Sequence, residues 1–513
     1  MPAADSTRVA VIGAGIGGAS FVSFLEDEIA RRGGGRATIA IDVFERADRI
    51  GGRTLATPDG ANAVELGASM AINQNRYVAD FADALGLARR PSTERPGRGG
   101  GRLAILTGAG GAAPFFESEW KAVTLAKMLY RFGPLDFFQL RAVGKAFIAN
   151  FTKIYDAQDG GRAFATPQAL LAHAGLESFT RRSCAGALAD VLGYSDNGGA
   201  DAAARAPVAA ELVSALTRNN YNQDFERMGA LCCFTAVAPL AAGGSAAAWS
   251  VPGGNAQIAR GLLERSTARV HLRSPVRAIR PAPAGDDGGG FLVQFNASQE
   301  ARYDVVVLAA PLAGSGIDVL DVLADSARAG AVADEQTAAF QPVYVTLVWG
   351  ALDPAYFNAS TADGGPGAAL NTAFGDILTT ANTELPFFSI GRYGDRRARW
   401  KFFSYRELSD EDLAPIFVDF VGGDAVVRHA WRAPGAYPVS RPLDDGDGMA
   451  PFVLASSRTG GGLVLYPSAL ERATSAMEVL AVAARNAALL VADAVAGPRT
   501  TRGGDVDDAR SEL

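Results

Sequence analysis

The apolar positions of the first fifty residues form two short continuous runs on either side of a longer stretch with helical patterning. The runs are Val9–Ile12 and Thr38–Phe44, and the stretch between them is Ala19–Arg32. Short continuous apolar runs are typical of strands buried on both faces. This order predicts a β-α-β unit, in which the two strands lie parallel in one sheet.

Residues 76 to 240 are mainly helical in pattern. We expect helices at Tyr77–Leu87, Trp120–Tyr155 (with a break at Gly133-Pro134), Pro167–Ala174, Leu176–Leu192 and Ala206–Tyr221. The stretch Trp120–Tyr155 has too many apolar residues for a single core-facing stripe. It therefore predicts a helix buried on several sides. The functional alternative is a helix that lines an apolar tunnel or touches a membrane surface.

Strand patterns return after residue 248 and follow the helix expected at Ala256–Glu264. The expected strands are Val270–Leu272, Val276–Arg280, Phe291–Phe295, Asp304–Pro311, Val343–Trp349, two further strands within Thr379–Tyr393 and Arg399–Tyr405, and Gly462–Tyr466. A last helix is expected from about Thr474 to Val495. The run Asp304–Pro311 is continuously apolar between polar and Pro residues, as a buried parallel strand is.

Charge and composition narrow the class of protein. The chain has 513 residues, enough for two or more domains, and a formal net charge of −7, with no basic stripe to displace the counterions of a nucleic acid. No continuous apolar run reaches the roughly 18–20 residues of a membrane helix. The sequence shows no signal peptide, so we expect a cytoplasmic protein.

Cysteine and histidine give no sign of a metal site. The three cysteines, Cys184, Cys232 and Cys233, cannot build a disulfide framework, and sequence neighbours rarely pair, so we expect small buried apolar residues. The three histidines are scattered without metal-ligand spacing. We expect no metal.

A glycine-rich turn follows the first strand and carries the clearest chemistry. In Gly13-Ala14-Gly15-Ile16-Gly17-Gly18, Gly13 permits a tight turn, Gly15 lets backbone approach a pyrophosphate, and Gly18 lets the helix pack close to the strand. The N-terminus of the following helix offers free N–H groups to phosphates. Glu45 ends the second strand, where a carboxylate can accept hydrogen bonds from ribose hydroxyls. We predict a dinucleotide site.

The segment Arg49-Ile50-Gly51-Gly52-Arg53 resembles the extended motif of FAD-dependent amine-oxidase-type flavoproteins, so the expected cofactor is FAD. The resemblance implies that backbone and an arginine of this segment lie along the FAD diphosphate. The predicted cofactor contacts are Gly13, Gly15, Gly17, Gly18, Glu45, Arg46, Gly52, Arg53, Gly67, Ala68, Ser69, Val276, Ala310, Glu471, Ser475 and Met477. In this architecture the last helix points its N-terminus at the flavin pyrimidine edge, where its N–H groups stabilise negative charge.

The predicted fold class is α/β, with a Rossmann-like FAD-binding domain of the glutathione-reductase type interleaved with a mixed α+β substrate domain. Residues 1–75, 245–312 and 455–500 would form the discontinuous FAD-binding domain. Residues 76–244 and 313–454 would form the substrate-binding domain, and residues 501–513 a flexible tail.

Nearly the whole chain resembles the prenylcysteine oxidases, also called prenylcysteine lyases, which include the farnesylcysteine lyases. Beside the FAD segment, the resemblance rests on three specific segments: Arg218-Asn219-Asn220-Tyr221-Asn222-Gln223, Trp249 to Asn255, and Ser475-Ala476-Met477-Glu478. It departs at Asn222, where the family has Gly, and at Tyr466 to Leu470, which replaces an Asn-Gly turn. We expect the second change to lie beside the flavin edge.

The resemblance implies an oxidase of prenyl thioethers such as farnesyl- or geranylgeranyl-cysteine. FAD takes a hydride at N5 from the allylic C1, water adds to the sulfur-stabilised cation, and a prenyl aldehyde and free cysteine result. Molecular oxygen reoxidises the flavin and yields hydrogen peroxide. The protein need only position C1, exclude water and bind an apolar chain.

Four residues are candidates near this chemistry. Tyr221 and Gln223 could orient the cysteine head group or a water, and the structural reading is that they cap a helix and stabilise a turn. Trp249 could wall the flavin or pack at a domain junction, and Tyr437 could form part of an aromatic wall over the flavin ring. Two other functions stay open: an FAD-dependent oxidase of another apolar substrate (an amine, isoprenoid or porphyrinogen), and a non-catalytic flavin-binding protein. The sequence leaves the oligomeric state undetermined.

Overall fold

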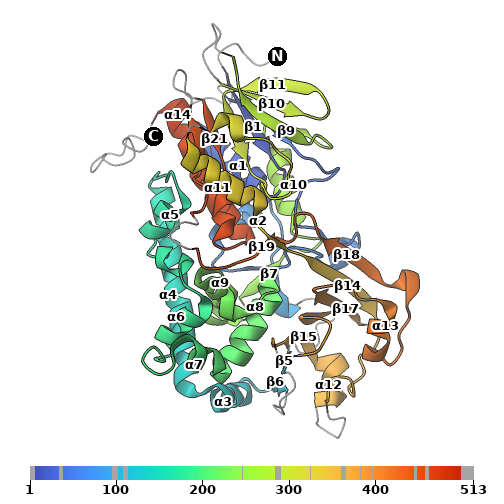
Figure 1. Cartoon of the computed structure of the whole chain (residues 1–513). Helices are drawn as coiled ribbons and strands as arrows, with labels where there is room; N and C mark the ends of the chain where they lie inside the picture. Colours follow the sequence, from blue (N-terminus) through green and yellow to red (C-terminus); the bar gives the residue numbers. More distant parts are fainter. Residues whose placement is uncertain are drawn as a thin grey trace.

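The computed structural model of the chain describes residues 6–33, 39–94, 102–107, 114–244, 247–283, 290–323, 325–359, 366–381, 383–394, 398–443, 448–456 and 462–497. The tail predicted at residues 501–513 lies outside them. A central sheet, a helical block and a second large sheet make up the molecule (Figure 1).

The central sheet is built from three segments far apart in the sequence. Its strand order is β20 (Val453–Ser456), β21 (Leu463–Leu465), β12 (Val305–Leu308), β1 (Thr7–Ile12), β2 (Ile39–Phe44) and β8 (Arg269–His271). All neighbours are parallel except β20 and β21. Its inner strands β1 and β12 are buried over Val9–Ile12 and Val305–Leu308, as their continuous apolar runs predict. The predicted Rossmann-like α/β class is confirmed.

One face of this sheet is covered by α1 (Ile16–Arg31) and α14 (Met477–Ala496), which pack side by side. Arg485 of α14 donates to the carboxylate of Glu28 of α1 at 2.9 Å, with both side chains buried. Within the described residues, α14 is long and apolar enough to cross a membrane by length and composition. Its mean hydropathy is high although charged residues interrupt it. Because 67% of its most apolar 18-residue stretch is buried within the fold, α14 is a core helix here.

The other face of the sheet packs against an antiparallel sheet and a helix. The antiparallel sheet contains β9 (Val276–Pro281), β10 (Phe291–Phe295) and β11 (Gln299–Tyr303), and the helix is α11 (Ser326–Thr337). Leu312, Val319 and Val332 share one apolar cluster with Val306 and Val464 of the central sheet. Residues 313–323 and 325–337, which the sequence grouped with the substrate domain, therefore pack against the nucleotide-binding sheet.

The helical block lies beside this unit, on the left of Figure 1. Its elements are α3 (Lys121–Phe132), α4 (Pro134–Asp159), α5 (Pro167–His173), α6 (Cys184–Val191), α7 (Gly199–Arg205), a π-helical turn at Val208–Val213, α8 (Ser214–Tyr221) and α9 (Ala230–Ala242). The break predicted at Gly133-Pro134 separates α3 from α4. Helix α2 (Arg76–Ala84) connects the block to α14, and α10 (Ala256–Arg265) packs on α1.

Two cysteines of this block differ from the sequence expectation. Cys184 of α6 and Cys233 of α9 form a disulfide, with their Cα atoms 5.8 Å apart. Cys232 is a free and buried thiol. All three are buried as expected, but the pairing arises because α6 packs on α9, a tertiary contact that the 49-residue separation does not reveal.

The second large sheet has seven strands and lies on the lower right of Figure 1. Its order is β18 (Val427–Trp431), β14 (Val343–Trp349), β17 (Arg399–Ser404), β16 (Ser389–Tyr393), β15 (Phe374–Thr379), β5 (Arg102–Leu106) and β6 (Phe115–Phe116). Helix α12 (Pro366–Ala373) precedes β15. Short strands β3 (Ala71–Ile72), β7 (Ala248–Ser250) and β4 (Arg90–Pro91) form another small sheet, and β13 (Phe340–Gln341) pairs with β19 (Tyr437–Pro438).

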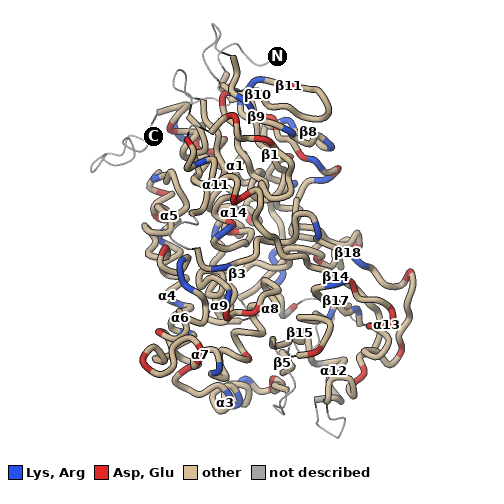
Figure 2. The backbone as a smooth tube through the Cα atoms, in the orientation of Figure 1, with Lys and Arg blue, Asp and Glu red and all other residues tan. Residues whose placement is uncertain are grey.

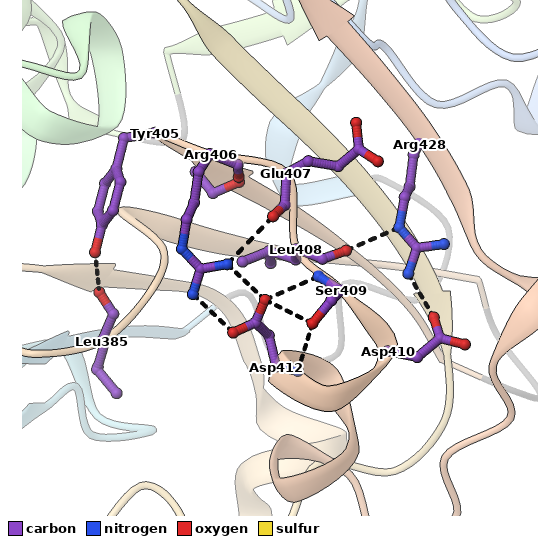
Figure 3. A network of polar contacts seen from close by, with 10 residues as sticks. Leu385, Tyr405, Arg406, Glu407, Leu408, Ser409, Asp410, Asp412 and Arg428 are labelled. Carbon is purple, nitrogen blue, oxygen red and sulfur yellow. Dashed lines mark hydrogen bonds and ion pairs between the residues drawn. The ribbon is translucent and has the colours of Figure 1, made fainter.

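Helix α13 (Asp410–Leu413) is attached to the outer edge of this sheet by polar contacts (Figure 3). Ser409 and Asp412 form a capping box, and Arg406 donates two hydrogen bonds to Asp412 at 2.6 and 2.7 Å. The Arg406 guanidinium holds the pKa of Asp412 below its usual range. Arg428 of β18 bonds to Asp410, so this short helix is tied to the edge strand.

Two adjacent glycines at the start of α1 should respond differently to substitution. A Cβ on Gly18 would lie 2.0 Å from the carbonyl oxygen of Gly13, whereas a Cβ on Gly17 would meet nothing closer than 3.8 Å. We expect Gly18→Ala to lower the free energy of unfolding by about 1–3 kcal/mol, because overpacking displaces the helix from the turn.

Gly17→Ala is the matched control, and we expect it to keep or raise stability by up to about 1 kcal/mol. Urea denaturation of the ligand-free variants measures both values. Equal stabilities for the two variants would contradict the packing role of Gly18.

Candidate active site

A cavity of about 1490 Å³ lies between the central sheet, the helical block and the seven-stranded sheet. Its wall includes the glycine turn after β1, the end of β2, the start of α14, and parts of α3, α4 and α8. The carboxyl ends of parallel strands and the starts of the following helices are where α/β sheets bind nucleotides. The cavity therefore joins a nucleotide-type site to a second region lined by the helical block.

The glycine turn has the geometry that its residues predict. Gly13 has φ +110° and donates its N–H to the carbonyl oxygen of Phe44 at 2.8 Å. Gly15 and Gly52 approach each other closely, and a Cβ on Gly52 would lie 3.2 Å from the Gly15 Cα. Gly13, Gly15 and Gly17 line the cavity, whereas Gly18 packs behind it against Gly13. The backbone therefore carries no side chain at the glycines where a pyrophosphate would lie.

Glu45 lies at the end of β2, on the cavity wall. Its carboxylate accepts the backbone N–H groups of Ala14 at 2.9 Å and Ala47 at 2.8 Å. These bonds fix the orientation of the carboxylate beside the turn and leave lone pairs for ribose hydroxyls. Arg46 also lines the cavity, is exposed, and donates to the carbonyl oxygen of Ala433 at 3.3 Å.

Arg53 and Glu471 form an ion pair that joins the first segment of the chain to the last. Arg53 donates to both carboxylate oxygens of Glu471, one of them at 2.9 Å, and to the carbonyl oxygen of Ala436 at 3.0 Å. Ser475 donates to the same carboxylate at 2.6 Å. Arg53 and Ser475 line the cavity, whereas Glu471 lies behind them. Glu471, predicted as a cofactor contact, thus positions two cavity residues and does not itself line the cavity.

The start of α14 forms part of the wall through Ser475, Ala476, Met477 and Glu478. The N-cap residue, Ala476, has no side chain that could accept a hydrogen bond from the first turn. Glu478 accepts the N–H groups of Tyr77 at 2.8 Å and Val78 at 2.9 Å and the hydroxyl of Tyr155 at 2.7 Å. Burial raises the pKa of Glu478 to about 7. This carboxyl therefore fixes α2 and α4 relative to the helix start.

The remaining predicted cofactor residues, Gly52, Gly67, Ala68, Ser69, Val276, Ala310 and Met477, also line the cavity. Fourteen of the sixteen predicted contacts thus line the cavity, and only Gly18 and Glu471 do not. These residues fit FAD, because the bare glycine turn, an acidic residue at the end of β2 and a second helix N-terminus all face the same cavity.

The structure separates the four catalytic candidates into two pairs. Tyr221 and Tyr437 both line the cavity, and their ring centroids are 5.5 Å apart with the rings nearly perpendicular. The Tyr221 hydroxyl donates to the carbonyl oxygen of Ser475 at 3.0 Å and lies 3.1 Å from the Thr474 hydroxyl. Burial raises the pKa of both tyrosines well above the usual value, so both are neutral.

Gln223 and Trp249 do not line the cavity, which corrects the prediction that they lie near the chemistry. Gln223 exchanges two hydrogen bonds with the backbone of Ser440, at 3.2 and 2.9 Å. Trp249 is buried on β7 with the Arg89 guanidinium over its ring. Gln223 thus fixes a turn against Ser440, and Trp249 packs against Arg89.

The two departures from the family pattern also have structural explanations. Asn222 ends α8 with φ +50°, a left-handed conformation that Gly adopts most easily and that Asn tolerates. Residues Pro467–Arg472 form a 3₁₀ helix, and Tyr466 bonds to Glu335 at 3.3 Å away from the cavity. None of the described residues 466–472 lines the cavity, contrary to the expectation that this change lies beside the flavin.

Sequence reasoning missed Lys401, a buried cation on the cavity wall. It lies on β17, donates to the Ser69 hydroxyl at 2.9 Å and to the carbonyl oxygen of Glu65 at 3.1 Å, and contacts the Phe403 ring. Its signal was a lysine within the apolar strand pattern Arg399–Ser404, since a buried lysine requires partners. The spacing along one strand could not show that Ser69 and Glu65 supply them.

Fold and cavity define a flavoprotein oxidoreductase that binds FAD. The family described as prenylcysteine lyase matches residues 115–501, and an NAD(P)-binding Rossmann-like domain matches residues 11–85. Since the first match covers more than half of the chain, the protein belongs to the prenylcysteine lyase family. The resemblance read from the sequence is thereby confirmed.

The chain is similar to several curated relatives over nearly its whole length. It is 26% identical to human prenylcysteine oxidase 1 over 508 residues, which cover 95% of this chain and 89% of the relative. It is 28% identical to bovine prenylcysteine oxidase 1-like protein, covering 95% and 90%, and 26% identical to farnesylcysteine lyase of Arabidopsis thaliana, covering 94% and 87%.

Among solved structures, cyclohexylamine oxidase from Brevibacterium oxydans matches with a TM-score of 0.60 and 16% identity, covering 95% of this chain and 99% of that one. A putrescine oxidase matches with a TM-score of 0.58 and 16% identity, covering 94% and 98%. These matches show a shared fold.

The buried carboxyl group of Glu65 should make the free energy of unfolding depend on pH. One carboxylate oxygen accepts the Asn255 N–H, and the other has no partner among the described residues. Burial raises the Glu65 pKa to about 7 from its model-compound value of 4.5. The folded state therefore binds this proton more tightly than the unfolded state, and the resulting stability is lost as pH rises from 4.5 through 7.

We expect Glu65→Gln to keep the acceptor for Asn255 and to remove this loss. The free energy of unfolding of the wild type relative to the variant should fall by about 1–3 kcal/mol between pH 5 and pH 8. Urea denaturation at a series of pH values measures the difference. A pH-independent difference would contradict the raised pKa.

Proposed function

We propose that this protein oxidises the thioether of prenylcysteines, such as farnesyl- or geranylgeranyl-cysteine, and cleaves it to a prenyl aldehyde and free cysteine, with molecular oxygen as the final electron acceptor. The names of the relatives in its family support this substrate. The observation that carries the proposal is the composition of the cavity wall, which is mostly apolar where the helical block forms it.

The apolar part of the wall comes from five elements of the helical block. Its members are Leu125 and Met128 of α3, Phe137, Phe147, Ile148 and Phe151 of α4, Leu212 of the π-helical turn, Leu216 of α8 and Leu240 of α9. Burial of a hydrocarbon chain stabilises by about 0.8 kcal/mol per methylene. A wall of this kind is suited to a long prenyl chain, whereas a small amine would leave most of it uncovered.

The reaction balances with water and oxygen as the other reactants. The C1 carbon of the prenyl group loses a hydride and becomes a cation that the neighbouring sulfur stabilises. Water adds to C1 and loses a proton, and the hemithioacetal breaks its carbon–sulfur bond to give the aldehyde and cysteine. FAD, when bound, supplies the hydride acceptor, and oxygen takes both electrons and two protons to become hydrogen peroxide.

The protein's own contribution is positioning and exclusion of water. Tyr221 and Tyr437 place two neutral aromatic rings where the apolar wall meets the start of α14. The N–H groups of the first turn of α14 offer positive partial charge to whatever negative charge develops there. Lys401 adds a buried positive charge to the same cavity. The predicted cytoplasmic location is a separate proposal that this chemistry does not test.

The direct test incubates purified, FAD-loaded protein with farnesylcysteine and measures farnesal, free cysteine and hydrogen peroxide. We expect the three products in equal amounts. The S-alkyl cysteine with a saturated chain of similar length is the control, because it lacks the allylic C1 and should not react. Reduction of the bound flavin by an amine or porphyrinogen, but not by farnesylcysteine, under anaerobic conditions would overturn the proposal.

A matched pair of variants tests the binding role of the apolar wall. We expect Ile148→Arg to raise the KM for farnesylcysteine at least about tenfold, because a charged group in the wall opposes burial of the prenyl chain. Ala149→Arg adds the same charge at the exposed neighbouring position, which does not line the cavity, and should leave KM unchanged. Initial rates of peroxide formation measure both, and equal KM values would place the prenyl chain elsewhere.

A further inference from the structure

Exposed large apolar side chains gather at one place on the described part of the chain. Helix α3 and the start of α4 carry six of them: Trp120 (74% exposed), Val123 (43%), Leu125 (42%), Tyr130 (94%), Leu135 (67%) and Phe138 (50%). These six residues are called the α3–α4 patch below. The sequence expectation of a helix buried on several sides is wrong for α3, where Phe132 is the buried residue.

Helix α3 has two sides with different surroundings. Lys121, Thr124, Leu125 and Met128 line the cavity, and Leu125 is the one member of the patch among them. Trp120, Val123, Lys127 and Tyr130 follow one another at spacings of three, four and three residues, so they share the opposite side of the helix. The helix is thus a thin wall between the cavity and the exterior, and it lies at the lower end of the molecule in Figure 1.

The charged side chains of helix α3 are all positive. Residues Lys121–Phe132 contain Lys121, Lys127 and Arg131 and no Asp or Glu (Figure 2). Lys127, on the outer side, donates to the carbonyl oxygen of Phe116 at 3.2 Å, and no described acidic residue pairs with Lys121 or Lys127.

The acidic side chains closest in sequence have other partners. Glu119 pairs with Arg102 at 3.4 Å, and Asp136 accepts the Tyr194 hydroxyl at 3.3 Å. Only Arg131 of the three basic residues has an acidic partner among the described residues, Glu211. Lys127 therefore has no acidic partner among the described residues and lies among the exposed aromatic and aliphatic side chains, whereas Lys121 lies on the cavity side of the same helix.

We propose that the α3–α4 patch docks on the surface of a lipid bilayer that carries anionic headgroups. Trp and Tyr favour the bilayer interface, and Lys can extend its ammonium group to headgroup phosphates while its stem stays among apolar groups. Because the whole chain has a net charge of −7, the attraction to an anionic surface is local to this helix. A second copy of the chain is a poorer occupant, because the lysines of a symmetric contact would face each other.

Docking through this surface brings a cavity-lining helix to the bilayer, where prenyl compounds partition. That consequence rests on the proposed function, but the docking itself does not depend on the substrate.

Co-sedimentation of the FAD-loaded full chain with vesicles tests the docking. We expect binding to vesicles of phosphatidylcholine mixed with phosphatidylglycerol, and weaker binding to phosphatidylcholine alone. The double variant Trp120→Ser/Tyr130→Ser should bind the mixed vesicles at least about tenfold more weakly, because it removes the two most exposed anchors. Lys127→Glu should abolish the preference for the mixed vesicles.

The matched control is Val418→Ser/Val421→Ser, which removes two exposed apolar side chains elsewhere on the surface and should leave vesicle binding unchanged. Retained flavin absorbance and an unchanged melting temperature show that each variant is folded. Absence of wild-type binding, or equal binding by the two double variants, would overturn the docking. Self-association that the Trp120→Ser/Tyr130→Ser variant abolishes, without vesicle binding, would assign the patch to a second copy instead.

Activity toward detergent-dispersed farnesylcysteine separates this proposal from the proposed function. We expect it to be unchanged in the double variant, because neither Trp120 nor Tyr130 lines the cavity. Docking without turnover would overturn the proposed substrate alone, and turnover without docking would overturn the membrane surface alone.

Discussion

The packing of α1 along α14 is the constraint on which the site depends. The two helices come from opposite ends of the chain, yet a Cβ on Gly17 would lie only 3.8 Å from the Leu480 Cβ. The buried Glu28–Arg485 pair fixes their relative position, since breaking such a pair leaves an uncompensated buried charge. As a result, the N-termini of both helices face the same cavity, one beside the glycine turn and one beside Tyr221.

Polar contacts then extend this arrangement to the parts that are suited to binding a substrate. Glu478 connects the start of α14 to α2 and α4, and the Arg53–Glu471 pair connects it to the segment after β2. Tyr221 bonds to Ser475, which lies next to the N-cap residue of that helix. These contacts thus fix the position of the apolar wall of the helical block relative to the nucleotide-binding sheet. Since each of these bonds joins distant segments, a change at the start of α14 would affect the cofactor and substrate regions together.

The fold and the nucleotide half of the site were predictable because their signals are local. The β-α-β order, the glycine turn and Glu45 lie within some forty residues of sequence, and each residue type has a direct backbone or charge reason to be there. The catalytic candidates were harder. Tyr221 and Gln223 are two residues apart, but Asn222 between them has a left-handed backbone conformation that turns the chain. Tyr221 therefore faces the cavity, whereas Gln223 bonds to Ser440. Lys401 and the Cys184–Cys233 pair were missed because their partners are remote in sequence.

The sequence by itself determined the first β-α-β unit and many of the longer helices and strands, the glycine positions where the backbone carries no side chain, and that an FAD-type dinucleotide site follows the first strand. Hydrophobic periodicity and glycine conformational freedom are properties of neighbouring residues, so they can be read along the chain. The tertiary structure alone decided which side chains meet at the cavity, which side of α3 is left exposed, and that a 3₁₀ helix, not a flavin contact, occupies Pro467–Arg472. These outcomes depend on how distant elements pack, and packing is settled by contacts between residues that the sequence keeps far apart.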